Sequence, residues 1–479
     1  MSASDPKQTL QNRLSRALET EHLGIHVEGR KSGNVMGGAS MRLLKGVLCL
    51  VLVSLVVLVA AFAWGRWRPP TAEEEKAFAE LSKDRRPASG RNAYPSLWFL
   101  GFDVPVDQAD LAYGALHQRL LAWMASDGTR ASHGDPRTLL MPDASPLPRV
   151  TSDEWDALCR GRGDDCLAKV QAHLEQARSL LSRHAPLLDQ EKNLINFDYV
   201  WSDLPGVPWL PVDPFGFTTG LWQTSIAADF AEGRQTEAMD AVCTQVAVMR
   251  RLHAGTNSLM ASGTFVGHTH GSVHLFAQLL SKFPMNQALP ASCATAFAPI
   301  RAEDVDMCPS MQEQFKEYSA IPWNPVRWYD RLTLSKEQTY RLYAVAYGAM
   351  CDPELPGKLL TDEPVDGLYT VPQADVFDRV SNRDGVRHAR IPAYTFSQNL
   401  EEQQDFAATL RMGALLMWLR ETRGQDVPLQ QRIRQRPDWM RFADDRKLGL
   451  DAGSRALTFE PRTHNIKPWM TSWPLPQGL

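Results

Sequence analysis

One stretch of the chain, residues 46–64, carries no charged side chain and constrains the fold more than any other feature. Its sequence, GVLCLVLVSLVVLVAAFAW, has the length of a helix that crosses a bilayer core of about 30 Å. Trp64, Trp67 and Arg68 mark its far end as aromatic and basic interface anchors do. Because helices of soluble cores are rarely apolar on every face, we expect residues 41–68 to form a transmembrane signal anchor.

The start of the chain resembles the start of a secretory protein. Met41 and the basic residues after it open the apolar run, which suggests that Met41 is the true first residue. Residues 1–40 would then be an extension without a fold, and we expect them to be poorly ordered. Cleavage after Ala63, at an A-x-A motif, is the alternative to a retained anchor, but the apolar run is longer than a typical signal peptide.

The location follows from this anchor. Basic residues on its two sides nearly balance, so the charge rule alone does not decide the orientation. The resemblance to a secretory start favours a cytoplasmic N-terminus. We expect a single-pass protein of the bacterial inner membrane, held through residues 46–64, with its large C-terminal domain in the periplasm.

Charge excludes one class of partner. The whole chain has a net charge of −4, but residues 1–70 hold nine Lys or Arg against four Asp or Glu. The remaining 42 basic and 51 acidic residues give residues 71–479 a net charge of −9. Because nucleic acid and anionic lipid headgroups both attract basic surfaces, an acidic domain indicates no nucleic-acid partner and makes anionic lipid headgroups poor partners.

The cysteines fit an oxidising compartment. One of the seven, Cys49, lies in the apolar run, and the other six are an even number that allows fifteen pairings. Cys159 and Cys166 bracket a short loop between two helical patterns, so we expect them to form a disulfide; two buried thiols are the alternative. The chain has no CxxC motif, which makes a cysteine zinc site less favourable.

Helical periodicity dominates the rest of the chain. Residues 218–232 and 235–253 flank Gly233 and predict a helical hairpin, whereas the Pro- and Gly-rich stretch between 350 and 396 predicts irregular structure. Residues 447–459 alternate around a D-A-G-S turn and predict a β-hairpin. The expected fold is mainly α: a transmembrane helix, a large helical domain and a small C-terminal β-hairpin. The expected segments are 1–40, the anchor 41–68, a charged juxtamembrane helix at 69–91, the helical soluble domain at 92–395, and a helix, hairpin and tail at 396–479.

One segment carries a family resemblance. Residues 92–102, NAYPSLWFLGF, followed by Asp103-Val-Pro and later by Cys159 and Cys166, resemble an uncharacterised group of membrane-anchored proteobacterial envelope proteins. The resemblance covers about a third of the chain and its motifs are not specific. It implies a location in the cell envelope, and it implies no activity, because the group has none assigned.

A histidine cluster offers the main candidate for metal chemistry. His270 and His274 are four residues apart and share a face of a helix, which His268 would join at a frayed end. Imidazoles bind zinc and copper, but the HExxH motif is missing and glycines flank the cluster. The alternative is a polar start of a helix with solvent-facing histidines, and we expect no cofactor.

Other catalytic signatures are weak. The sequence has neither a GxSxG motif nor a phosphate-binding loop, and a pairing of Ser262 with His268 would be one of many such pairs in a long chain. The neighbouring acids Asp362 and Glu363 are expected to be solvated loop residues.

Aromatic residues in proline-rich loops are the second candidate site. Such residues offer large rigid surfaces for binding proteins or sugars, although they also fill gaps where loops cover helices. The candidate binding residues are Trp201, Trp209, Phe215, Trp323 and Trp328.

These observations favour a non-catalytic protein that binds or scaffolds another envelope protein, including the role of a protective inhibitor. The alternative is an envelope hydrolase or metal-dependent enzyme that uses His268, His270 and His274. A sugar-binding protein that uses Trp201 and Trp209 is the third hypothesis.

Overall fold

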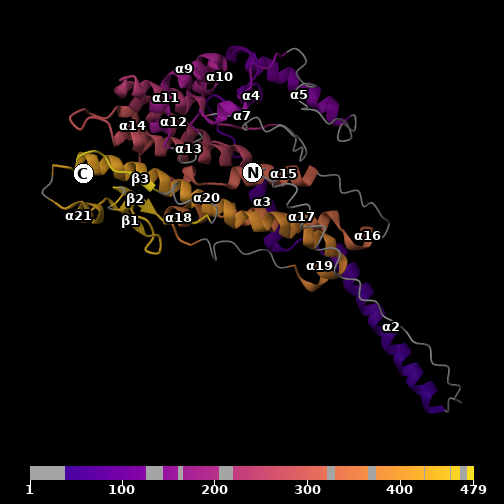
Figure 1. Cartoon of the computed structure of the whole chain (residues 1–479). Helices are drawn as coiled ribbons and strands as arrows, with labels where there is room; N and C mark the ends of the chain where they lie inside the picture. Colours follow the sequence, from indigo (N-terminus) through magenta and orange to yellow (C-terminus); the bar gives the residue numbers. More distant parts are fainter. Residues whose placement is uncertain are drawn as a thin grey trace, which may run out of the picture. The chain divides into compact units, whose positions relative to one another are not determined.

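The structure is a computed structural model (Figure 1), and the chain divides into two compact units, residues 1–60 and 61–479. Within the first unit the structure describes residues 38–60, which belong to helix α2, and the second unit holds the rest of the protein. The described residues are 38–125, 144–159, 165–203, 220–320, 330–364, 374–424, 427–451, 453, 455–463 and 472–479.

Helix α2 (Gly38–Trp67) confirms that the apolar run forms one long helix. It is the one helix in the described part of the chain that is long and apolar enough to cross a membrane, and the apolar window is not buried by the rest of the protein. The helix ends before Pro69 and Pro70, because proline has no N–H to continue it. Residues 1–37 of the expected extension at residues 1–40 lie outside the described residues.

The second unit is mainly helical, as the sequence predicts. Helix α3 (Ala72–Leu81) starts at a capping box in which Thr71 and Glu74 exchange hydrogen bonds. The other N-terminal helices are α4 (Tyr94–Trp98), α5 (Ala109–Ala125), α7 (Ser152–Trp155), α8 (Cys166–Ala172), α9 (Leu174–Arg183) and α10 (Ala185–Lys192), with 3₁₀ turns at Val106–Gln108 and Asn193–Asn196.

The larger of the two hydrophobic cores forms around a helical hairpin. Helices α11 (Leu221–Ala231) and α12 (Gln235–Ala254) are joined through Gly233, whose φ of +89° suits glycine. Helix α13 (Leu259–Leu280) packs against α12 and against the long helix α20 (Arg383–Glu421). Residues such as Phe276 and Leu415 are fully buried there.

A second core lies beside α3. It is built from α15 (Cys308–Ala320), α17 (Lys336–Ala349) and the N-terminal half of α20, with Tyr347 and Phe396 in contact at its centre. The shorter helices are α14 (Ala291–Ala296), α16 (Asp330–Thr333), α18 (Leu355–Leu360), α19 (Val376–Ser381) and α21 (Leu429–Arg434), with 3₁₀ turns at Ala302–Asp304 and Asp438–Met440.

The expectation of irregular structure between 350 and 396 is wrong for much of that stretch. Helices α18 and α19 lie there, and α20 passes through Pro392 and through the expected boundary at 395/396. The reason is packing: Val386, Ala389, Phe396 and Leu400 keep one helical face in the second core on both sides of the proline.

The predicted C-terminal hairpin is confirmed and gains a strand. Strands β1 (Leu448–Asp451) and β2 (Ala456–Phe459) pair antiparallel, with Leu450 opposite Leu457. Strand β3 (Ser472–Pro474), which the sequence did not reveal, pairs antiparallel with β2 in the order β1-β2-β3.

Three disulfides connect the helical body. The predicted pair Cys159–Cys166 is bonded, and Cys243–Cys293 ties α12 to α14. Cys308–Cys351 ties the start of α15 to the residue that follows α17 by two positions. Cys49 on α2 is a free thiol. Three such bonds are typical of an oxidising compartment.

Candidate functional sites

The three histidines predicted as metal ligands all lie on α13, but they contact different parts of the molecule. Nδ1 of His270 lies 2.6 Å from Oγ1 of Thr409 on α20. His274 packs against Trp473 of β3. His268 precedes His270 by two residues, which turns the two side chains to nearly opposite faces of the helix. Across the described ranges, no three His, Cys, Asp or Glu side chains are grouped in a way that would hold a metal ion.

Ser262 lies beside His253, a residue that the sequence analysis did not single out. Its Oγ is 3.3 Å from Nδ1 of His253, and Nε2 of that ring is 2.8 Å from Oε1 of Gln403. All three side chains are buried, and the imidazole packs against Phe406. Burial lowers the pKa of His253, so the ring stays neutral in the core. The group is therefore a buried polar contact between α12, α13 and α20.

The predicted aromatic binding loop starts from a firmly held base. Asn92 donates to the carbonyl of Trp201 and accepts from its N–H, both at 2.8 Å. Asn257 makes the same pair of bonds to Ser202. Two side-chain amides thus fix the main chain where it enters the loop. Trp209, Phe215, Trp323 and Trp328 lie outside the described residues.

An acidic–aromatic cluster lies at this base. We use that name for Tyr94, Tyr113, Asp203, Glu313 and Glu317, which come from α4, α5, α15 and the loop base and which interact electrostatically. The hydroxyl of Tyr113 donates to Asp203 at 2.8 Å, and its ring meets that of Tyr94 edge to face. Residues 321–329, which contain the second tryptophan pair, directly follow α15 in the chain.

The cluster perturbs its own acid groups. Burial, and then the charge of Glu313, raises the pKa of Glu317 to about 7. Burial also raises the pKa of Glu313 and raises that of Tyr94 to about 12. Lys316 forms an ion pair with Glu313 at 3.3 Å, and its positive charge partly opposes the rise in the pKa of Glu313. At neutral pH Glu317 exists both with and without its proton, which suits a group that transfers protons.

The sequence held only a faint signal for this cluster. Glu313 and Glu317 are four residues apart and so share a face of α15. Asp203 follows two residues after Trp201 but is 110 positions from Glu313 in the chain. Since no local pattern links these three acids, only the fold brings them together.

A groove runs along strand β1 at the other end of the second unit. Its volume is about 480 Å³, and no residue of β2 or β3 lines it. Residues 448–450 are consecutive and all line the groove, whereas only every second residue would line it if it lay on one face of the sheet. The groove therefore follows the outer edge of β1. Along this edge every second residue directs its N–H and C=O away from β2. The groove lining comprises Gln430, Ile433, Arg434, Arg436, Phe442, Ala443, Asp444, Arg446, Lys447, Leu448, Gly449 and Leu450.

The groove combines an apolar surface with positive charge. Ile433, Phe442 and Leu450 supply apolar atoms. Arg434 and Lys447 are exposed and form no ion pair with a residue that the structure describes. Such a lining favours an acidic, partly apolar ligand.

A buried ion-pair network holds the sheet next to this groove. Arg446 pairs with Asp362 at 2.8 Å and with Asp405 of α20 at 2.9 Å. Asp405 also accepts hydrogen bonds from the main chain of Arg462 and Thr463. The expectation that Asp362 is a solvated loop acid is therefore wrong: its side chain is fully buried because Arg446 compensates its charge.

No protein-family model, curated protein or solved structure matches the chain. Its function must therefore be inferred from its own residues and their geometry.

Proposed function

We propose that the chain is a membrane-anchored protein of the bacterial inner membrane whose helical domain lies in the periplasm and binds another envelope protein without catalysis. Helix α2 supports the anchor, and the three disulfides support an oxidising location for everything after it. Because all six paired cysteines follow the apolar run, they favour a cytoplasmic N-terminus. A partner held at the membrane surface suits a scaffold or a protective inhibitor.

The groove along β1 is the observation that carries the binding role. Among the described strands β1 lies at the edge of the sheet. A strand edge accepts a further strand from a partner, because the partner's main chain completes the hydrogen bonds of the edge. The four residues of β1 match a peptide segment of about four residues, or about 13 Å. With Arg434 and Lys447 beside it, the groove favours an extended segment that carries acidic side chains and an apolar residue.

Crosslinking from the groove tests this proposal. A photo-crosslinking amino acid at Arg434 of the full-length protein in native membranes should trap a specific partner, whereas the same amino acid at exposed Lys282 should not. The double variant Arg434→Glu, Lys447→Glu should weaken binding of the purified partner at least tenfold. The control, Arg423→Glu with Lys282→Glu, reverses two exposed charges elsewhere and should leave binding unchanged. Equal binding by both double variants would refute the role of the groove.

A second function, acid–base hydrolysis, is favoured by one specific observation. Glu317 has a pKa of about 7 and lies in a cluster with further carboxyl and phenol groups at the base of the tryptophan loop. A protonated carboxyl and a carboxylate are the pair that glycoside hydrolysis requires, and aromatic residues nearby suit sugar binding.

Envelope glycan fragments incubated with the full-length protein test this alternative. Turnover should show an apparent pKa near 7 and should be lost in Glu317→Gln. The groove variant Arg434→Glu, Lys447→Glu should retain it. Glycan turnover that is lost on changing Glu317 but not on changing the groove would favour the enzyme over the binding protein.

A further inference from the structure

The last turn of α2 packs directly on the segment that leads into α20. A Cβ on Gly65 would lie 2.3 Å from Oγ of Ser381 and 2.6 Å from the carbonyl oxygen of Phe377, so glycine is needed for this close approach. Arg66 donates to the carbonyl of Leu334 at 2.9 Å. The residues at which the apolar run ends are therefore in contact with α19 and with the loop before α17.

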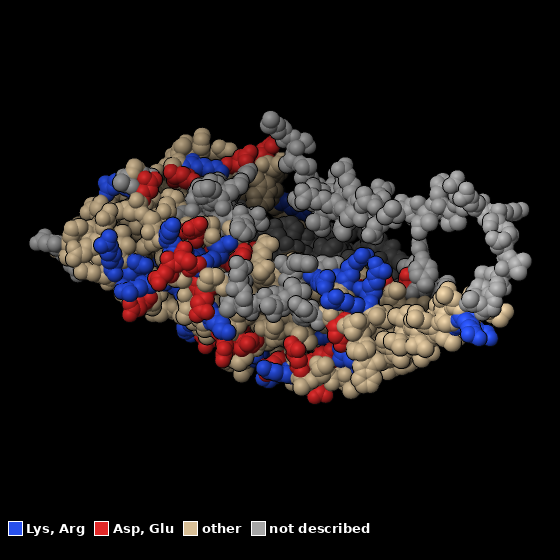
Figure 2. All heavy atoms as spheres, turned by 90° about the horizontal axis from the view of Figure 1, so that it is seen from below, with Lys and Arg blue, Asp and Glu red and all other residues tan. Residues whose placement is uncertain are grey.

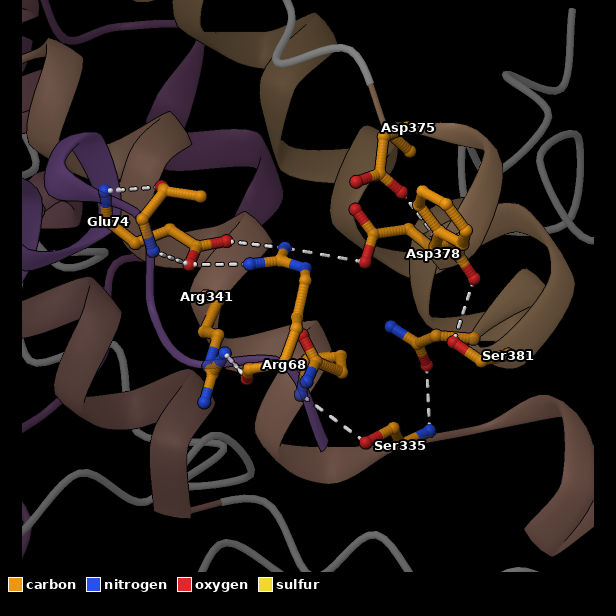
Figure 3. Close-up of polar contacts among 12 residues, drawn as sticks. Arg68, Glu74, Ser335, Arg341, Asp375, Asp378 and Ser381 are labelled. Carbon is orange, nitrogen blue, oxygen red and sulfur yellow. Dashed lines mark hydrogen bonds and ion pairs between the residues drawn. The ribbon is translucent and has the colours of Figure 1, made fainter. Parts of the chain in front are cut away.

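A buried polar network makes this junction rigid (Figure 3). Arg68 makes two hydrogen bonds to Glu74, at 3.0 and 2.8 Å, and lies 3.5 Å from Asp378 of α19. Arg341 of α17 donates to the carbonyl of Arg68 at 2.7 Å. Burial opposes the ionisation of Glu74, but its hydrogen bonds from Arg68 and from the main chain of Thr71 lower its pKa. Three helices, α3, α17 and α19, thus hold the chain where it leaves the apolar run.

A basic face begins at this junction. We use that name for Arg379 of α19 and for Arg383, Arg387 and Arg390 of α20, all exposed. The three on α20 follow the spacing i, i+4, i+7, so they share one side of its first two turns, beside buried Val386. Figure 2 shows Lys and Arg atoms gathered in one group on a face where acidic and basic side chains otherwise alternate.

Little in the described chain neutralises these guanidinium groups. None of the four forms an ion pair with a described residue, although Arg379 donates to the carbonyl of Ala374. The nearest acids on the same elements are Asp375, which caps α19, Asp378, which is buried beside Arg68, and Asp384, which accepts a hydrogen bond from Thr333. The four arginines therefore face solvent, and the acids on the same elements carry less negative charge than the arginines carry positive charge.

The surroundings have the composition of a membrane interface. Trp64 and Trp67 on the last turns of α2 are 57% and 79% exposed, and Val376 at the start of α19 is 64% exposed. Tryptophan prefers the headgroup level of a bilayer, and exposed apolar residues there enter the same layer. Arginines fixed within a Debye length, about 8–10 Å, of such a surface sense the charge of its lipids.

We propose that the basic face binds the headgroups of anionic phospholipids in the leaflet into which the C-terminal end of α2 opens. Each guanidinium donates charge-assisted hydrogen bonds to phosphate oxygens, while α2 supplies the hydrophobic attachment. The face then sets the tilt and rotation of the helical domain above the membrane. This role is independent of the groove and of the partner protein proposed above.

Native mass spectrometry of the full-length protein in detergent micelles tests the proposal. Phosphatidylglycerol should bind at least tenfold more tightly than phosphatidylcholine, and the preference should weaken when salt is raised from about 50 to 500 mM. The triple variant Arg383→Gln, Arg387→Gln, Arg390→Gln should lose most of this preference. The variant with lysine at the same three positions should keep it, because the charges remain.

Two further arms make the result decisive. A control with three exposed arginines changed elsewhere, Arg301→Gln, Arg423→Gln and Arg441→Gln, should bind like the wild type. Glycerol 3-phosphate at millimolar concentration should not displace the lipid, since a free phosphate lacks the acyl chains beside α2. An unchanged preference in the first triple variant, or full displacement by glycerol 3-phosphate, would overturn the proposal. Loss of binding by variants of Arg434 and Lys447 to the partner would leave it untouched.

Discussion

The disulfides allow a prediction whose magnitude follows from their positions in the chain. Cys243–Cys293 closes a loop with a sequence separation of 50 residues, Cys308–Cys351 one of 43, and Cys159–Cys166 one of 7. In the chain-entropy description a disulfide stabilises the fold by restricting the unfolded chain, and longer loops give a larger effect. Removal should therefore lower the free energy of unfolding by about 4 kcal/mol for each long loop and by about 2.5 kcal/mol for the short one.

Pairwise replacement by alanine isolates this effect. All six paired cysteines are buried, so the packing lost on truncation is similar at the three sites and the loop length sets the order. Guanidinium chloride unfolding of the full-length protein in micelles, followed by tryptophan fluorescence, gives the three free energies. Cys49→Ala, at the free thiol of α2, serves as the control and should leave the unfolding of the second unit unchanged. If loss of Cys159–Cys166 costs as much as loss of Cys243–Cys293, loop closure does not govern the stability of this fold.

Three further predictions concern single residues. Because the pKa of Glu317 is about 7 in the folded state and about 4.3 in the unfolded state, the folded state binds the extra proton between these values, so stability should fall by about 3 kcal/mol as pH rises from 4.5 to 7.5; unfolding curves of Glu317→Gln should lack that fall. Arg68→Ala should cost about 3–5 kcal/mol, because Glu74 and Asp378 remain buried without their cation; chemical unfolding measures it, and a loss below 1 kcal/mol would contradict it. Gly65→Val should separate the end of α2 from α19, because its side chain would overlap Ser381; faster proteolysis at the junction, with no change for Gly46→Val, is the expected result.

Local patterns predicted the features that depend on neighbouring residues. The apolar run became α2, and residues 447–459, which alternate around a turn, became the hairpin of β1 and β2. The short loop between Cys159 and Cys166 favoured their disulfide for the same reason. In each case the groups that interact lie within one turn or one short loop.

Features that depend on distant residues could not be read in this way. Strand β3 is three residues long and is stabilised by burial of Trp473 against β2 and α13, so its own sequence carries little strand signal. The proline- and glycine-rich stretch that contains Pro392 predicted irregular structure, but the buried face of α20 outweighs one missing hydrogen bond. The acidic–aromatic cluster joins Tyr94 to Glu317 across more than two hundred positions.

Helix α20 has a mechanical consequence. At 39 residues it is about 58 Å long, and it begins at the basic face beside the end of α2. Further along α20, Asp405 forms an ion pair with Arg446, next to strand β1. Near the end of α20, the carbonyl of Leu419 accepts a hydrogen bond from Arg432 of α21. A load on the sheet would therefore pass along one continuous helix to the junction at which α2 ends.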